Sequence, residues 1–448
     1  MAQATVHTPG TTSPASDWRV WVPCAGMALC SWLSFVDRGV LGVLSPTILK
    51  DTGMSGQDYG NVVFFFFVAY TIANPLWGSI LDHVGLRVGM LLAVALWTAA
   101  SASHAWMSGF VGFAMARALL GLGEGATFPG GLRTAVESLP PNLRARGIAT
   151  SFSGGTIGAI VTPLMMVPIA VTYGWRKAFI VTGALGIAWL VVWTAIARPP
   201  YLPTAERRSS RLAWPNPFER RFWSLVFSYA LPAIAPGPVL NLMPIYLTRG
   251  LGVSQADLAG IFWTPPAAWG LGYFVGGWAA DRFAADTPRP VGMFVVLAIC
   301  SLAFGLAPIA QSVPIAIGLM ALACFIGGWF QMLALKVGSY AYPREQAAMM
   351  SGIASGSWSL LNAVLAAGLL WVLPPGLRGQ VETACGQRSP DDFLLAVTCP
   401  AVQGIGRLFD QQRWGDAFWL IALLPTIGVA AWLLLSRTHA GGQADPSR

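Results

Sequence analysis

The chain has 448 residues, of which 55% are hydrophobic and only 10% are charged. A soluble globular protein carries about 25% charged residues, so this composition excludes an ordinary soluble enzyme, a coiled coil and a disordered chain. The formal net charge of +8 is not gathered into Lys/Arg runs interleaved with aromatic residues, which excludes nucleic-acid binding. The sequence predicts an all-α protein that crosses the lipid bilayer many times.

Residues 1–20 are predicted to form a polar cytoplasmic tail, because no cleavable signal peptide is visible. Two six-helix units follow, at 21–198 and 222–436, joined by a cytoplasmic linker at 199–221 that is rich in Pro and Arg. Residues 437–448 form a second tail. A spanning helix needs about 20 apolar residues, and we expect twelve such segments, at about 22–49, 59–81, 88–106, 109–137, 147–171, 178–197, 222–247, 258–280, 291–311, 313–341, 347–374 and 416–436.

Weak internal repeats relate the two units. Three short strings of the first unit recur in the second unit in the same order, which indicates a duplicated six-helix element. Two such halves around a site at the membrane midplane form an alternating-access transporter. The paired strings are 78–83 with 277–282, 147–151 with 352–356, and 174–179 with 413–418.

The distribution of Lys and Arg predicts the orientation. With both termini inside, sixteen of the 27 basic residues fall on the inner side, eight on the outer side, and three inside the segments. This bias favours cytoplasmic termini and a multi-pass protein of the cell (inner) membrane. The loop 375–415 is then extracytoplasmic and holds Cys385 and Cys399. An oxidising compartment permits a disulfide there, but sequence spacing leaves that pairing open.

The loop 78–87 follows the second segment. We expect Gly78 to let two helices approach closely, Asp82 to accept hydrogen bonds from a neighbouring helix N-terminus, Gly85 to make a tight turn and Arg87 to offer a charge partner. The alternative for Asp82 is an ordinary helix cap. The string resembles the signature loop of the major facilitator superfamily, which implies a conformational latch, and its degenerate copy holds Asp281 and Arg282.

The fourth segment carries intramembrane charges. Arg117, Gly121, Glu124 and Phe128 are spaced by four, three and four residues, which puts them on one helical face. Charged groups in hydrocarbon are costly and are expected to face the bundle interior. The string 117–130, with Phe35-Val36-Asp37-Arg38 and strings at 146–186, is similar to the anion:cation symporter family within that superfamily. This resemblance implies symport of an organic anion, such as a sugar acid or carboxylate, with protons or sodium.

A charge tally points to the same solute. The apolar segments hold two acids, Asp37 and Glu124, against three bases, Arg38, Arg117 and Lys336. An unpaired buried cation is expensive, and a small anionic substrate would neutralise it. Arg38 is assigned to the substrate carboxylate, because Arg offers two parallel hydrogen bonds. Lys336 is the weaker candidate, and its alternative is a Lys that extends to the inner surface.

Asp37, Glu124 and Arg117 are the predicted proton-coupling residues. Burial and a nearby Arg act on a carboxyl in opposite directions, so substrate arrival at the Arg changes whether the carboxyl binds a proton. The alternative is a permanent Glu124–Arg117 ion pair. Asp37 points to a different helix face from Arg38, so its partner is expected on another helix. Protons are preferred over sodium, and no cofactor is expected.

Other polar residues are candidates for binding hydroxyl groups. These are Tyr70 and Asn74 in the second segment and Asn241 and Gln331 in the second half, with ordinary helix–helix contacts as their alternative. Two backbone features complete the set. Glycines 154, 155 and 158 favour close helix packing over a phosphate loop, and prolines 232, 236 and 238 predict a broken seventh helix beside a cavity.

Taken together, these features predict a monomeric, proton-coupled uptake symporter for a small organic anion with the major facilitator fold. The first alternative is a drug or metabolite exporter of the same superfamily, although the fifth segment lacks the Gly-Pro-x-x-Gly-Gly run of such exporters. The second alternative is a polytopic membrane enzyme or sensor, which would need a catalytic cluster or a large soluble domain.

Overall fold

The structure is a computed structural model that describes residues 18–140, 143–202, 215–283, 289–341, 344–370, 373–386 and 393–436. In these ranges every regular element is a helix. The predicted tail 437–448, most of the tail 1–20 and the linker residues 203–214 lie outside the described part of the chain.

The first half contains seven α-helices and two short 3-10 turns. Glycines at positive φ make two of its tight turns, Gly53 (φ 70°) between α1 and α2 and Gly85 (φ 83°) between α2 and α3. Gly85 therefore makes the turn predicted for it. The elements are η2 (Trp18–Trp21), α1 (Val22–Thr52), α2 (Gly56–Val84), α3 (Leu86–Ser103), η3 (His104–Trp106), α4 (Phe110–Glu124), α5 (Thr127–Ser138), α6 (Arg144–Tyr173) and α7 (Trp175–Ile196).

The second half is more often interrupted. As predicted, its first segment breaks at the prolines, with α8 ending at Ala230 and α9 beginning at Pro236. The elements are α8 (Arg220–Ala230), α9 (Pro236–Ile245), η4 (Tyr246–Gly250), α10 (Leu258–Ile261), α11 (Thr264–Phe283), α12 (Val291–Ser301), η5 (Leu302–Leu306), α13 (Ala307–Ala310), α14 (Val313–Ala341), α15 (Arg344–Ala367), α16 (Pro375–Gly386), α17 (Phe393–Gln403), α18 (Ile405–Asp410) and α19 (Trp414–Ser436).

The twelve predicted segments all appear as helical spans. Eight helices of the described chain are long and apolar enough to cross a membrane by themselves. The other four are the α4–α5, α8–α9, α10–α11 and α15 segments, which are broken or less apolar. Each break exposes backbone groups, which membranes tolerate only where protein or a cavity covers them.

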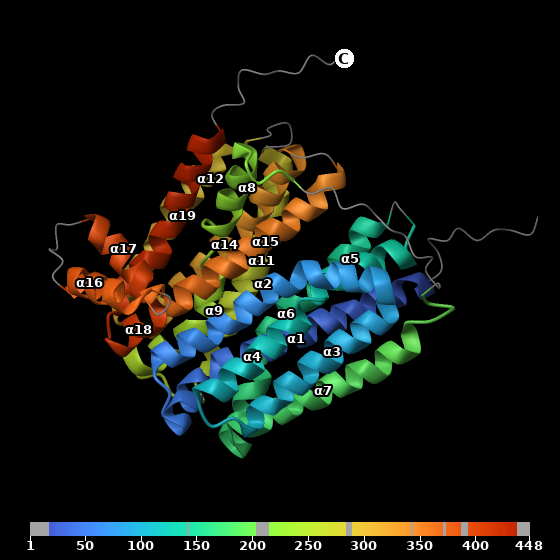
Figure 1. The fold of residues 1–448 in the computed structure, drawn as a ribbon, viewed down its shortest axis with the longest axis horizontal. Coiled ribbons are helices and arrows are strands. Elements are labelled where there is room, and N and C mark those ends of the chain that lie inside the picture. Colours follow the sequence, from blue (N-terminus) through green and yellow to red (C-terminus); the bar gives the residue numbers. More distant parts are fainter. Residues whose placement is uncertain are drawn as a thin grey trace, which may run out of the picture.

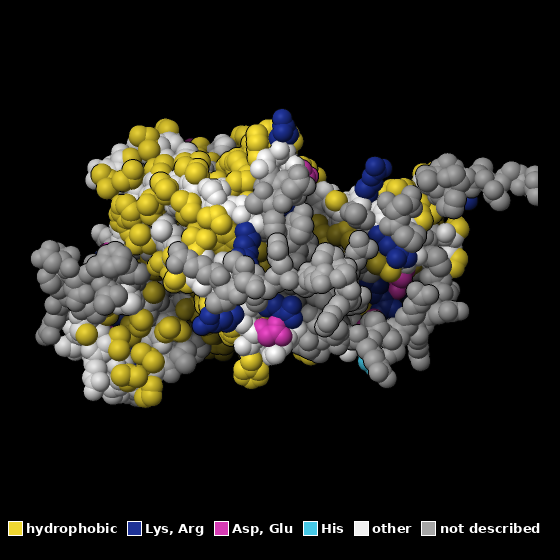
Figure 2. All heavy atoms as spheres, turned by 90° about the horizontal axis from the view of Figure 1, so that it is seen from above, with side chains coloured by type: hydrophobic (Ala, Val, Ile, Leu, Met, Phe, Trp, Pro, Cys, Tyr) yellow, Lys and Arg dark blue, Asp and Glu magenta, His cyan; other side chains and the backbone are white. Residues whose placement is uncertain are grey.

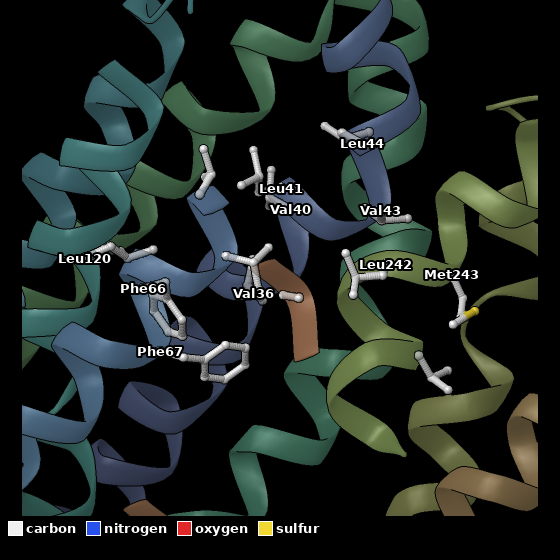
Figure 3. Packing of buried hydrophobic residues seen from close by; sticks show 14 of the residues in the cluster. Val36, Val40, Leu41, Val43, Leu44, Phe66, Phe67, Leu120, Leu242 and Met243 are labelled. Atoms are coloured by element: carbon white, nitrogen blue, oxygen red, sulfur yellow. The ribbon is translucent and has the colours of Figure 1, made fainter. Parts of the chain in front are cut away.

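The two halves lie side by side and share a continuous core (Figure 1). We call the end with the α1–α2 turn outer and the end with the α2–α3 turn inner, following the orientation predicted from the basic residues. Buried side chains of α1, α2 and α9 meet where the halves join, among them Val40, Phe67 and Leu242, and Leu120 of α4 belongs to the same buried cluster within the first half (Figure 3). This junction positions the site described below.

Close helix packing inside the first half depends on small residues. A Cβ at Gly154 of α6 would collide with the carbonyl oxygen of Ala28, and one at Gly158 with that of Trp32. The backbones of α1 and α6 therefore approach closely, as the glycines at 154 and 158 predict. Gly78 behaves differently, because nothing lies within 4 Å of a Cβ placed there. The expectation that Gly78 permits a close helix approach is wrong in this conformation.

Hydrogen bonds hold the outer ends of the two halves together. Asp410, the last residue of α18, accepts from the backbone N–H groups of Gly56 (2.7 Å) and Gln57 (2.9 Å), which open α2. The Thr47 hydroxyl donates to the Gln255 Oε1 at 2.8 Å, and the Gln255 Nε2 donates to the Val43 carbonyl at 2.9 Å. Asp410 of the opposite half thus adds acceptors for N–H groups of the α2 N-terminus, beside the capping box that Ser55 and Asp58 form.

Further contacts continue to mid-depth. The Tyr59 hydroxyl donates to the Asn241 carbonyl (2.7 Å), and the Thr71 hydroxyl approaches the Gly356 carbonyl (3.4 Å). From there the halves diverge toward the inner ends of α5 and α15 (Figure 1). The halves are thus joined at the outer end and spread apart at the inner end.

The predicted outer loop 375–415 contains three short helices, α16 to α18. Cys385 and Cys399 form a disulfide with their Cα atoms 5.5 Å apart, so the pairing that the sequence left open does exist. The membrane-facing surface is apolar, as a bilayer requires. Exposed hydrophobic side chains such as Leu92, Phe274 and Trp278 are part of it, and Figure 2 shows broad hydrophobic areas with Lys and Arg in smaller groups between them.

Candidate functional site

A cavity of about 690 Å³, which includes open solvent at its mouth, lies where the two halves meet. Helices α1, α2 and α6 line it from the first half, and α9, α11 and α15 from the second. The lining residues are Phe35, Arg38, Gly39, Val43, Phe66, Phe67, Ala159, Thr162, Pro163, Pro236, Gly237, Leu240, Asn241, Phe262, Trp269 and Trp358.

Arg38 is the one charged residue among these lining residues. Its Nε donates to the Oε2 of Glu124 in an ion pair whose carboxylate is fully buried, while 18% of the Arg38 side chain remains exposed. The guanidinium carbon lies 5.1, 5.3 and 4.5 Å from the ring centroids of Phe35, Phe66 and Tyr70. These distances are within cation–π range, so the aromatic rings and Glu124 hold a positive charge at the cavity wall.

Glu124 therefore pairs with Arg38 and not with Arg117, the partner considered from the sequence. The hydroxyl of Ser34 also donates to the Glu124 Oε2 at 3.0 Å, while Oε1 is buried with no hydrogen-bond partner in the described chain. Arg117 is buried behind this pair, and its Nη2 donates to the Arg38 carbonyl at 3.4 Å. It supports the backbone of Arg38 without lining the cavity.

Asp37 lies apart from the cavity, inside the first half. Its Oδ1 accepts from the Ser101 hydroxyl of α3 at 2.6 Å, and the Ser101 hydroxyl lies 2.8 Å from that of Thr182 on α7. The expectation of a partner on another helix is confirmed. Asp37 is 2% exposed, and its Oδ2 has no hydrogen-bond partner among the described residues. A buried carboxyl with an unused oxygen is a place where a proton can be held.

The polar candidates of the sequence have different positions. Asn241 lines the cavity, with its Nδ2 donating to the Gly237 carbonyl at 2.9 Å. Tyr70 stands behind Arg38, with its ring against the guanidinium. Gln331 is buried, and its Oε1 accepts from the Trp269 indole (3.1 Å) and from the Tyr273 hydroxyl, so it orients cavity aromatics from behind. Asn74 is half-buried on α2 and does not line the cavity.

Lys336, the weaker candidate for the anion, is not among the lining residues. Its Nζ donates to the Ala280 carbonyl of α11 at 2.7 Å, next to the degenerate signature loop. This position corresponds to the alternative of a Lys that extends toward the inner surface. In this conformation Arg38, and not Lys336, lies at the cavity wall.

The loop 78–87 makes its charge contact with a residue that sequence reasoning did not single out. Asp82 accepts from the Arg133 Nη1 at 2.7 Å, and Arg133 also pairs with Glu137 at 2.5 Å. Arg87 is exposed, and its carbonyl accepts from the indole of Trp193 at 3.3 Å. Asp82, expected to accept from a neighbouring helix N-terminus, thus accepts from the Arg133 side chain in this conformation. The spacing of Arg133 four residues before Glu137 signals that pair, whereas its contact with Asp82 has no signal in the sequence.

The degenerate copy of the loop is exposed. Asp281 and Arg282 both face solvent at the inner end of α11, and Asp281 has no ion pair within the described ranges. The guanidinium of Arg282 lies 5.8 Å from the ring centroid of Phe283. Among the residues that the structure describes, neither copy of the loop has a side-chain hydrogen bond or ion pair with the other half.

The individual aromatic residues that line the cavity are those that sequence reasoning did not assign. Phe35 on α1 and Trp269 on α11 approach with their ring centroids 6.0 Å apart, and so do Phe67 on α2 and Trp358 on α15. Each pair joins the two halves. The run of four Phe at 64–67 was a visible signal, but only half of such a run can face one way in a helix.

Comparison with known proteins identifies the architecture. The sequence profile described as Major Facilitator Superfamily matches residues 27–367. The chain belongs to this superfamily. It is thus a multi-pass membrane transporter and not an enzyme, and the expectations of a twelve-helix fold and of a relationship to sugar-acid and organic-anion transporters are confirmed.

Curated relatives of similar length support this assignment. The hexuronate transporter of Escherichia coli K12 is 23% identical over 440 residues, covering 94% of this chain and 95% of the relative. The D-galactonate transporter of E. coli O6:H1 is 26% identical over 433 residues, covering 90% and 92%. The galacturonate transporter of Dickeya chrysanthemi is 26% identical over 282 residues, covering 59% and 82%.

A solved structure shows the same fold. It is a bacterial homologue of the human lysosomal transporter Spinster, in an inward-facing and unoccupied conformation. It matches with a TM-score of 0.71 at 19% identity and covers 98% of this chain and 100% of that one. At this identity the likeness concerns the fold alone.

Proposed function

We propose that this transporter is a proton-coupled symporter that takes up a small organic anion by alternating access. The observation that carries the proposal is Arg38, a guanidinium at the wall of the central cavity that is paired with the buried carboxylate of Glu124. The names of the relatives, which are transporters of hexuronate, galactonate and galacturonate, support an organic anion.

Proton coupling follows because the substrate carboxylate and Glu124 compete for the same cation, the guanidinium of Arg38. A substrate carboxylate that reaches Arg38 can form two parallel hydrogen bonds with its guanidinium. Glu124, which now accepts from the Arg38 Nε, then loses part of its compensation while it stays fully buried. A buried carboxylate without a paired charge binds a proton instead. Anion binding thus draws a proton to Glu124, and release of the anion lets the Arg38–Glu124 pair form again.

Asp37 supplies a second position for a proton in the same half. It lies one residue from Arg38 but is directed toward Ser101 and Thr182, away from the cavity. Arg117 is buried between the two acids and contacts the backbone of Arg38. In this proposal Glu124 senses the substrate directly, and Asp37 responds to the electrostatic change through Arg117. Sodium is the less favoured coupling ion.

The proposed setting is the cell inner membrane, with cytoplasmic termini and a monomeric transporter. The bias of basic residues toward the inner side supports this orientation. The Asp82–Arg133 contact at the inner end of the first half supports a latch that rearranges as the halves rock. Asp281 and Arg282, exposed in the inward-facing state, are the proposed counterpart in the second half.

Uptake of labelled carboxylates into proteoliposomes tests the proposal. An inward proton gradient should drive accumulation that collapses on addition of an uncoupler, and Glu124→Gln should retain anion exchange while losing accumulation. Glu382→Gln is the matched control, because Glu382 pairs with Arg407 in the outer loop segment. Absence of proton-dependent flux for every carboxylate of a broad panel would refute symport, and flux outward only would favour the exporter.

A further inference from the structure

The central cavity has far more aromatic surface than hydrogen-bonding capacity. Six of its lining residues are Phe or Trp, and three others, Arg38, Thr162 and Asn241, have polar side chains. Ligand sites fix polar ligands through a few placed donors and acceptors, so the free capacity of these polar groups limits which ligand can be bound.

Most of that polar capacity is already used within the protein. The Thr162 hydroxyl donates to the Gly158 carbonyl at 2.7 Å, and the Asn241 Nδ2 donates to the Gly237 carbonyl at 2.9 Å. Both indole N–H groups are also occupied, Trp269 with Gln331 (3.1 Å) and Trp358 with the Ala233 carbonyl (2.7 Å). The tryptophans therefore present ring faces and edges to a ligand but no donor.

What remains is one cation, the second N–H of the Asn241 amide, a few acceptor positions and flat apolar walls. The cation is Arg38, which keeps donors beyond the Nε that it gives to Glu124. The walls are the two cross-half pairs, Phe35 with Trp269 and Phe67 with Trp358, together with Phe66 and Phe262. Figure 3 shows Phe66 and Phe67 side by side where α2 faces α1.

We infer that the preferred substrate is a carboxylate with an aromatic ring and few hydroxyl groups. The inference rests on the proposed function and narrows its substrate class. A sugar acid carries a hydroxyl group on nearly every carbon, and in this cavity most of those hydroxyls would lose water without gaining a partner. Each such loss lowers affinity roughly tenfold. A benzoate- or phenylacetate-like anion places its carboxylate on Arg38 and its ring among the aromatic side chains, where stacking adds to burial.

The test compares two ligand classes on the purified full-length transporter. Affinities are measured by calorimetry for 4-hydroxybenzoate and phenylacetate, for galacturonate and galactonate, and for benzamide as an uncharged control. Counterflow of the same acids is measured in proteoliposomes. We expect the aromatic acids to bind at least tenfold more tightly than the sugar acids and to undergo counterflow, with no binding of benzamide.

Variants on one helix provide a matched control. Trp269 and Trp278 both belong to α11, but Trp269 lines the cavity whereas Trp278 is 61% exposed on the surface. Trp269→Leu should lower the affinity for 4-hydroxybenzoate about tenfold relative to that for cyclohexanecarboxylate, and Trp278→Leu should leave this ratio unchanged. The ratio is insensitive to a general loss of folded protein.

The possible failures are distinct. Equal or tighter binding of the sugar acids would overturn the inference and leave organic-anion transport intact. An unchanged ratio in Trp269→Leu would also overturn it. If neither class binds or undergoes counterflow in monodisperse, folded protein, the proposed function itself is refuted, and the inference with it.

Discussion

Removing the charge of Arg38 should destabilise the first half, and a second substitution at Glu124 should restore most of the lost stability. In Arg38→Gln the carboxylate of Glu124, which is fully buried, loses its ion-pair partner. Breaking a buried pair from one side costs about 3–5 kcal/mol. For a domain of this size each kcal/mol lowers Tm by about 2–4 °C, so a decrease of about 10 °C is expected. In the double variant Arg38→Gln/Glu124→Gln no buried charge is left at the pair, and most of the loss should be recovered.

The unfolding temperatures of the wild type, the two single variants and the double variant are measured in detergent by tryptophan fluorescence, and together they form a double-mutant cycle. The deficit of Arg38→Gln should shrink as pH falls, because protonation of Glu124 removes the unpaired charge. The exposed pair of Arg407 with Glu382 is the control, for which a coupling below about 1 kcal/mol is expected. Additive effects of the Arg38 and Glu124 substitutions, or a loss under about 1 kcal/mol in Arg38→Gln, would refute the reasoning.

Three further predictions concern other parts of the molecule. Asp410→Ala removes the acceptors for the first N–H groups of α2, which costs about 0.5–2 kcal/mol, and should shift the conformational equilibrium away from the inward-facing state. Double electron–electron resonance measures this shift as a change in distance between spin labels on the outer ends of α1 and α15. Unchanged distances would contradict the prediction. Cys385→Ser removes the disulfide that closes a loop of 14 residues, and the lost stabilisation is about 3 kcal/mol. The variant should be cleaved faster by proteases within 375–415 while transport is retained. Loss of transport would argue against a purely structural role for the disulfide. Asp37→Asn keeps the acceptor for Ser101 and should leave anion affinity within about threefold while it slows proton-driven uptake, and an affinity loss beyond tenfold would place Asp37 at the substrate.

The twelve spans were predictable because lipid forces each one to satisfy its own backbone hydrogen bonds. Long apolar runs therefore mark helices directly, and prolines mark breaks such as the one between Ala230 and Pro236. The helices α16 to α18 were not foreseen, because short amphipathic stretches in an aqueous loop have no comparable signal. Their capping role, in which Asp410 closes the outer end, depends on contacts more than 350 residues apart in sequence.

The charged site was predictable in membership but not in pairing. Helical spacing puts Arg117 and Glu124 on one face of α4, yet they are seven residues apart, and Glu124 pairs with Arg38 on α1 instead. Which helices face each other is decided by packing, and a single sequence does not contain that choice. The same reason explains why the contact of Asp82 with Arg133 was not foreseen.

The character of the cavity could not be predicted from residue types alone. The chain contains twenty tryptophans, and most of them are expected from the sequence to anchor the protein at the membrane–water interface. Trp269 and Trp358 line the cavity because α11 and α15 present them to Phe35 and Phe67 of the first half. Their donors are directed away from the cavity by Gln331 and by the Ala233 carbonyl, a detail of side-chain orientation.

The exchange of partners at Arg38 is tested most directly by counting protons as the anion binds. Purified transporter in weakly buffered solution at pH 7 is mixed with a saturating carboxylate ligand, and a pH indicator reports proton uptake. The wild type should take up close to one proton per anion bound, and Glu124→Gln should bind the anion with almost no proton uptake. Anion binding to the wild type without proton uptake, or equal uptake by Glu124→Gln, would contradict displacement of Glu124 from Arg38 by the substrate.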